Sequence, residues 1–133
     1  MRYLLDIDLA SHMVREPKGA AAKRMARVGT QNVCVSILVA AELRYDALRK
    51  DIAKLRQTIE ELLKRIVIEP FGNPADRYYA EIRSRLEQTG TTPIGQNDTL
   101  IAAHALALDC TLVTNNEREF SRIEALRVEN WLK

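Results

Sequence analysis

The feature that most constrains the fold is a repeated alternation between short, unbroken apolar runs and longer stretches with helical spacing. The runs are rich in Leu and β-branched residues, and they fall near residues 3–7, 33–39, 66–71, 110–116 and 125–131. Strands that read as continuous apolar runs and alternate with helices are typical of a parallel sheet covered on both faces. The sequence therefore predicts an α/β, three-layer fold with about five parallel strands flanked by helices.

Helices are expected between these runs, because apolar residues there recur every three or four positions. The clearest stripe comprises Leu55, Ile59, Leu62, Leu63 and Ile66. Pro17 and Gly19 divide the stretch over 9–28 into two helices, since proline removes a donor and glycine readily ends a helix. The remaining predicted elements are a helix whose start Asn73 and Asp76 cap and charge, a loop over 89–95, a helix begun by Asn97 or Asp98, and a short helical turn over 117–120.

Length and composition favour one globular domain over residues 1–133, with 47% hydrophobic and 29% charged residues. No apolar run approaches the ~20 residues of a membrane span, and the run over 3–5 is too short for a secretory signal. A cytoplasmic protein is therefore expected, with Cys34 and Cys110 as isolated, reduced thiols. The net charge of +2 says little, but 14 Arg against 6 Lys slightly favours a phosphate-bearing or acidic partner.

Acidic and amide side chains follow the predicted strands, at the edge where parallel sheets place functional groups. Asp6 and Asp8 follow the first strand, Glu42 follows the second, and Asp98 begins the helix before the fourth. The residues after the fourth strand include Asn115, Asn116, Glu117 and Glu119. Carboxylates gathered in one cleft repel one another, and Mg²⁺ or Mn²⁺ with oxygen ligands is the usual compensation. Such a site predicts metal-assisted hydrolysis of a phosphate ester.

Each of these side chains also has a purely structural explanation. Asp98 alone is more often a helix N-cap, and Glu42 alone is a solvated helix residue. Asp6 is the hardest to explain structurally, because it interrupts an apolar run where burial is expected. His104 lies among alanines on an apolar helix, so a hydrogen-bonded structural histidine is expected there rather than an acid–base catalyst.

The spacing of Asp6 and Asp8 leaves two other enzyme classes open. A haloacid-dehalogenase phosphatase would use the pair as nucleophile and acid, but it favours Thr or Val where this chain has Ala10. A response-regulator receiver would need a phospho-accepting Asp directly after the third strand, and the segment "EPFGNP" over 69–74 contains none.

Three segments carry a resemblance to a known family: "LLDIDLASHMV" (4–14), "VSILVAAELRYDA" (35–47) and "PIGQNDTLIAAHALALDCTLVTNNEREFSRIEALRVENW" (93–131). They resemble PIN-domain ribonucleases of the VapC toxin group, from type II toxin–antitoxin systems. The resemblance implies a five-stranded parallel sheet and a Mg²⁺- or Mn²⁺-dependent endoribonuclease acting on tRNA or ribosomal RNA. It also implies a homodimer and a VapB-type antitoxin that inserts a tail into the active-site groove and binds operator DNA.

The resemblance also assigns roles by position. Asp6, Glu42 and Asp98 match the three central acidic residues of the family, and Asn116 matches a fourth position that is often Asp. Glu119 matches a nearby acidic position. Asp6 and Asp98 are thereby expected to bind the metal directly, Glu42 directly or through water, and Asn116 to orient a water or ligand.

The chain departs from the family pattern at two places. The family usually reads Asp-Thr-Asn where this chain has Asp6, Ile7 and Asp8, and the glycine usual after "AELRY" is Asp46. Loss of hydrogen bonds around metal ligands typically costs ~10–100-fold in metal affinity or activity, while Asp8 is expected to add a carboxylate. A second function therefore stays open: a catalytically attenuated PIN scaffold that acts mainly as the antitoxin-binding partner in an operon repressor complex.

Overall fold

The computed structural model describes residues 1–90 and 92–133. Its centre is a sheet of 5 parallel strands in the order β3-β2-β1-β4-β5, which confirms the predicted architecture. The strands are β1 (Tyr3–Leu5), β2 (Val33–Ser36), β3 (Val67–Glu69), β4 (Thr111–Val113) and β5 (Val128–Glu129). Each lies inside one of the predicted apolar runs.

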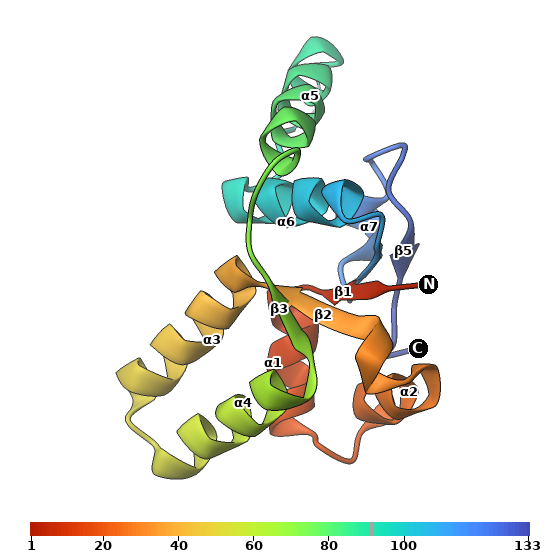
Figure 1. The fold of residues 1–133 in the computed structure, drawn as a ribbon. Helices are drawn as coiled ribbons and strands as arrows, with labels where there is room; N and C mark the ends of the chain where they lie inside the picture. Colours follow the sequence, from red (N-terminus) through yellow and green to blue (C-terminus); the bar gives the residue numbers. More distant parts are fainter. Residues whose placement is uncertain (91) are drawn as a thin grey trace.

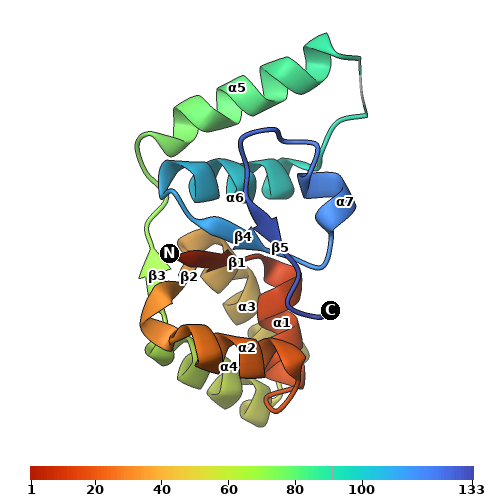
Figure 2. The same ribbon diagram turned by 90° about the vertical axis from the view of Figure 1, so that its right-hand side faces the viewer.

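Helices cover both faces of this sheet, with α1 to α4 on one face and α5 and α6 on the other (Figure 1). The turned view shows the same three layers, with the short α7 beside the end of β4 (Figure 2). The helices are α1 (Ile7–Arg15), α2 (Ala20–Val28), α3 (Ile37–Lys50), α4 (Ala53–Arg65), α5 (Ala75–Gln88), α6 (Gln96–Ala107) and α7 (Glu117–Phe120), with a 3₁₀ turn over Thr30–Asn32. Thr91, part of the loop predicted over 89–95, lies outside the described residues.

The core explains why the strands read as unbroken apolar runs. Leu4, Leu5, Val35 and Leu112 are completely buried, since helices pack on both faces of the sheet. At the β5 edge, the Trp131 ring packs against that of Tyr3 with centroids 5.3 Å apart. Within residues 1–90 and 92–133, no helix is both long and apolar enough to cross a membrane.

The strand predicted over 33–39 ends earlier than expected. The hydroxyl of Ser36 accepts a 3.1 Å hydrogen bond from the N–H of Leu38 and caps the first turn of α3. A serine side chain that satisfies a free N–H of the first helical turn is a strong helix start. The apolar residues 37–39 therefore belong to a helix, because the capping hydroxyl outweighs the β-branched character of Ile37 and Val39.

Two further helices begin within two residues of the predicted starts. α5 begins at Ala75, so Pro74, rather than Asn73, occupies the N-cap position, and Asp76 lies in the first turn as predicted. α6 begins at Gln96 after Gly95. Asp98 is consequently inside the first turn of α6 and does not cap it, which removes the simplest structural explanation for this carboxylate.

Candidate active site

Three buried polar residues stand side by side at the carboxyl edge of the sheet. Leu5 of β1 pairs with Val35 of β2 and with Val113 of β4. The next residues along these strands are Ser36, Asp6 and Thr114, all three of them buried. A polar row at this edge of a parallel sheet is where the fold places functional groups.

Asp6 is the central member of this row, and its side chain is held on two sides. Its Oδ1 accepts a 2.9 Å hydrogen bond from the N–H of Leu9, which caps α1, and the Thr114 hydroxyl also hydrogen-bonds the carboxylate. Burial raises the pKa of Asp6 to about 6, against the lowering effect of these two hydrogen bonds. The negative charges of Asp8 and Asp98 raise it further.

Asp6 lines a cavity of about 200 Å³ together with Glu42 and Asp98. The three residues come from the N-terminal regions of α1, α3 and α6, which converge at the carboxyl edge of the sheet. The rest of the lining is Ile7, Leu38, Val39, Ala41, Asn97 and Ile101. The fold thus brings together the three carboxylates that the sequence singled out, from positions 36 and 56 residues apart.

A second set of carboxylates surrounds Asp98. Burial raises the pKa of Asp98, and the charges of Asp8 and Glu119 raise it further. Asp8 is exposed on the first turn of α1, whereas Glu119 on α7 is half-buried and bonded to Arg122 at 2.8 Å. Both residues proposed as accessory groups therefore act electrostatically on the cavity without lining it.

Asn116 lies further from the cavity than its match to the family suggests. It is exposed at the N-cap position of α7, and it lines a separate hollow with Glu117 and Arg118. Its backbone N–H donates a 2.9 Å hydrogen bond to the hydroxyl of Thr114. Asn116 is thus linked to Asp6 through Thr114, but the structure does not bring its side chain together with the three carboxylates.

Sequence reasoning missed Thr114 and Ser36. Each is the first residue after the apolar part of its strand, and that position was the available signal. The residues singled out at the strand ends carry charged or amide groups, and the hydroxyls of these two residues were not among them. His104 behaves as predicted: it is buried, its Nε2 contacts the carbonyl of Pro70 at 3.1 Å, and burial lowers its pKa.

The donor set of the cavity suits a hard divalent cation in kind and charge. Asp6, Glu42 and Asp98 supply only carboxylate oxygens, the ligands that Mg²⁺ and Mn²⁺ prefer. The pKa values of Asp6 and Asp98 are raised mainly by burial, with a smaller contribution from neighbouring carboxylates, and a bound cation would offset both effects. In the described part of the chain, no three His, Cys, Asp or Glu side chains are yet close enough to enclose a metal ion. The carboxylates fit such an ion on the condition that their side chains turn toward it.

Comparison with known proteins gives matches over nearly the whole chain. The PIN domain family matches residues 3–126. "Ribonuclease VapC2" of Rickettsia felis is 36% identical over 100% of both chains, and "tRNA(fMet)-specific endonuclease VapC" of Salmonella typhimurium is 30% identical over 98% of both.

Solved structures give the same result. VapBC2 from Rickettsia felis, bound to a DNA fragment from its promoter, matches with a TM-score of 0.91 and 34% identity, covering 98% of this chain and 99% of that one. DNA-bound VapBC from Salmonella typhimurium matches with a TM-score of 0.86 and 28% identity, over 98% of both chains.

Proposed function

The chain belongs to the PIN-domain family, among its VapC ribonucleases, and on that premise we propose that its acidic cavity cleaves RNA phosphodiesters with the help of Mg²⁺ or Mn²⁺. It is the toxin of a type II toxin–antitoxin pair. The observation that carries the proposal is the convergence of Asp6, Glu42 and Asp98 on one cavity at the carboxyl edge of the sheet.

Asp6 and Asp98 would hold the cation directly, and the exposed Glu42 directly or through water. When bound, such an ion lowers the pKa of water and stabilises negative charge on a phosphodiester. Hydrogen bonds from the Leu9 N–H and the Thr114 hydroxyl hold the Asp6 carboxylate in place before any cation binds. A carboxylate whose orientation is set by its neighbours needs little rearrangement to bind.

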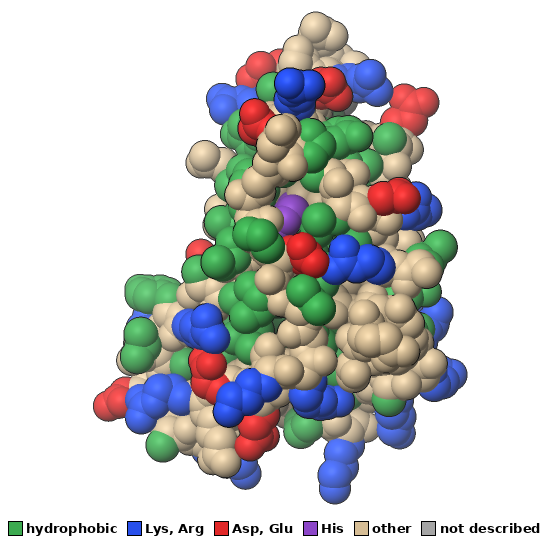
Figure 3. Space-filling model, viewed as in Figure 1, with side chains coloured by type: hydrophobic (Ala, Val, Ile, Leu, Met, Phe, Trp, Pro, Cys, Tyr) green, Lys and Arg blue, Asp and Glu red, His purple; other side chains and the backbone are tan. Residues whose placement is uncertain are grey.

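The substrate we propose is RNA, with tRNA favoured by the name of the Salmonella relative. Lys and Arg side chains gather over α2, at the lower right of Figure 3. Lys23, Arg24 and Arg27 line a hollow there together with Lys133 near the C-terminus. Cationic side chains of this kind bind a phosphate backbone without regard to sequence.

The partner we propose is a VapB-type antitoxin that inhibits this chain in a cytoplasmic complex. Solved neighbours are VapBC complexes, two of them bound to DNA, so contact with operator DNA is expected through the antitoxin. A homodimer remains a prediction from the family resemblance.

The test is cleavage of a total tRNA pool by the purified chain in Mn²⁺ and in EDTA. We expect cleavage only with Mn²⁺, and its loss in Asp98→Asn. Asp76→Asn makes the same change in the first turn of α5, away from the cavity, and should cleave as the wild type does. Cleavage that continues unchanged in EDTA, or equally in Asp98→Asn, would refute the proposed chemistry.

An attenuated scaffold is the second candidate, and Ile7 is the observation that favours it. Ile7 lines the cavity where the family resemblance places a hydroxyl. Asp46, by contrast, pairs with Arg49 and Lys50 on the surface of α3, so its departure from the pattern does not touch the cavity. Expression without a partner separates the two functions. Growth arrest abolished by Asp6→Ala indicates a nuclease, whereas harmless expression of folded protein indicates the scaffold.

A further inference from the structure

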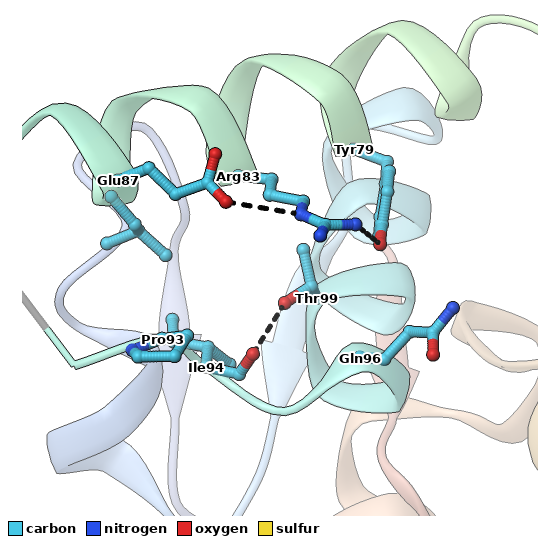
Figure 4. Close-up of a pocket in the computed structure, with 8 residues that line it drawn as sticks. Tyr79, Arg83, Glu87, Pro93, Ile94, Gln96 and Thr99 are labelled. Carbon is cyan, nitrogen blue, oxygen red and sulfur yellow. Dashed lines mark hydrogen bonds and ion pairs between the residues drawn. The ribbon is translucent and has the colours of Figure 1, made fainter.

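A second cavity, of about 340 Å³, lies between α5 and the start of α6 (Figure 4). Its lining is Tyr79, Arg83, Leu86, Glu87, Pro93, Ile94, Gln96 and Thr99. We propose that this α5–α6 pocket binds one unpaired base of the RNA chain whose phosphodiester is cleaved in the acidic cavity. The inference rests on the proposed ribonuclease function and adds to it a site for substrate selection.

The charges in the α5–α6 pocket favour a neutral polar ligand over a phosphate. The Arg83 guanidinium donates to the Tyr79 hydroxyl at 3.2 Å and pairs with the Glu87 carboxylate at 3.6 Å (Figure 4). The positive charge of Arg83 is therefore balanced by Glu87, which would repel a phosphate. The hydrogen bond to Tyr79 uses one of the five N–H donors of Arg83, and the Gln96 side chain adds donors and an acceptor. Such a set matches the hydrogen-bonding edge of a base.

The walls of the pocket suit a flat ring. Tyr79 projects from α5 toward α6, opposite the segment that carries Pro93 and Ile94 (Figure 4). The Thr99 hydroxyl donates to the carbonyls of Gly95 at 2.9 Å and Ile94 at 3.4 Å, which fixes this segment against α6. Unpaired bases are commonly recognised by stacking on aromatic side chains combined with hydrogen bonds to their edges.

The α5–α6 pocket also lies within reach of the acidic cavity. Gln96 and Thr99 are three residues apart on one side of α6 and line the pocket, while Asn97 and Asp98 on the opposite side line the acidic cavity. The first turn of α6 thus separates the two hollows by about one helix diameter, ~10 Å. An RNA strand with one phosphate at Asp98 can pass over this turn and place a neighbouring base beside Tyr79.

Binding of single-stranded RNA in EDTA tests the inference without cleavage. The cleavage site is first mapped in Mn²⁺, and a set of short RNAs that span this site is then prepared. Each RNA in the set lacks the base at one position, and its affinity for the protein is measured by fluorescence anisotropy. For the wild type, loss of the base at one position flanking the cleaved bond should weaken binding about tenfold. Tyr79→Ala should bind the intact RNA about tenfold more weakly and no longer respond to that missing base.

Arg83→Ala and Arg77→Ala form a matched pair, because both remove one positive charge from exposed positions of α5 and only Arg83 lines the pocket. Arg83→Ala should lose the dependence on the missing base, and Arg77→Ala should keep it. If a folded Tyr79→Ala still binds RNA with the wild-type dependence on the missing base, the inference is overturned. The proposed ribonuclease function stands in that case as long as the chain cleaves RNA in Mn²⁺. If Tyr79→Ala binds RNA as the wild type does but binds the antitoxin more weakly, the pocket belongs to the protein partner and the inference is overturned. A chain that cleaves no RNA overturns both proposals.

Discussion

The Oδ1 atom of Asp6 lies 2.9 Å from the backbone nitrogen of Leu9, whose N–H it accepts as the cap of α1. Asp6 as a whole is 3% exposed, and it lines the acidic cavity. Capping stabilises a helix by roughly 0.5–2 kcal/mol, whereas burial of the charge beside other carboxylates opposes folding. Asp6 is thus fixed in place by the fold in a setting where its negative charge is destabilising, and the proposed cation would compensate that charge.

The stability of the cation-free protein should accordingly fall as pH rises from about 4 to 6. The pKa of Asp6 is about 6 in the folded chain against 3.8 ordinarily. Between these values the folded state binds more protons than the unfolded state, so the free energy of unfolding decreases with pH and stays lower above pH 6. Asp6→Asn keeps a capping acceptor and cannot ionise. It should reduce this dependence, to which the raised pKa of Asp98 also contributes, and it should raise the free energy of unfolding at pH 7 by about 3 kcal/mol.

Urea denaturation in EDTA at pH 4, 5, 6 and 7 measures this dependence. Asp76→Asn, an exposed carboxylate on α5, should retain the wild-type profile. Parallel curves for the wild type and Asp6→Asn would show that Asp6 titrates normally in the folded chain.

Cation affinity should show the opposite trend with pH. Protonation of Asp6 below its pKa of about 6 removes a proposed ligand, so Mn²⁺ should bind more weakly at pH 5.5 than at pH 7.5. Asp98→Ala should weaken Mn²⁺ binding at pH 7.5 by about tenfold or more. Loss of a residue that only hydrogen-bonds a metal ligand already lowers metal affinity or activity by ~10–100-fold, and Asp98 is proposed as a ligand itself. Isothermal titration calorimetry with Mn²⁺ measures both effects. Equal affinity in the wild type and Asp98→Ala would exclude Asp98 as a ligand.

Thr114 should matter for the cation as well as for stability. Its hydroxyl hydrogen-bonds Asp6 and accepts from the N–H of Asn116, so Thr114→Val leaves both partners without it. We expect a loss of about 1–3 kcal/mol in the free energy of unfolding and a severalfold weaker Mn²⁺ affinity. Thr111→Val is the matched control, because Thr111 is a buried threonine at the other end of β4. Thr111→Val should lower the free energy of unfolding and leave the Mn²⁺ affinity unchanged. Equal Mn²⁺ affinity in both variants would assign Thr114 a purely structural role.

The fold was predictable because the central strands β1, β2 and β4 are apolar runs largely buried between the two helical layers, and the sequence shows such runs directly. The edge strands β3 and β5 are only partly buried, and their place follows from the alternation with helices. The convergence of Asp6, Glu42 and Asp98 was predictable because the carboxyl ends of parallel strands share one edge. Helix starts were harder to predict, since residues 37–39 suit a strand or a helix and a single hydroxyl at Ser36 decides between them. The position of the Asn116 side chain depends on the conformation of the backbone turn before α7. The spacing of apolar residues does not predict the conformation of such a turn.

Asp8 should strengthen cation binding only slightly. Its charge raises the pKa of Asp6 and of Asp98, yet its side chain is exposed and outside the lining of the acidic cavity. Water and salt screen an exposed charge, so Asp8→Asn should weaken Mn²⁺ affinity by only about two- to threefold. RNA cleavage at saturating Mn²⁺ should stay within about twofold of the wild-type rate. Glu16→Gln removes an exposed charge at the far end of α1 and should change neither quantity. A tenfold or greater loss of affinity in Asp8→Asn would instead make Asp8 a direct ligand and move the cation toward the first turn of α1.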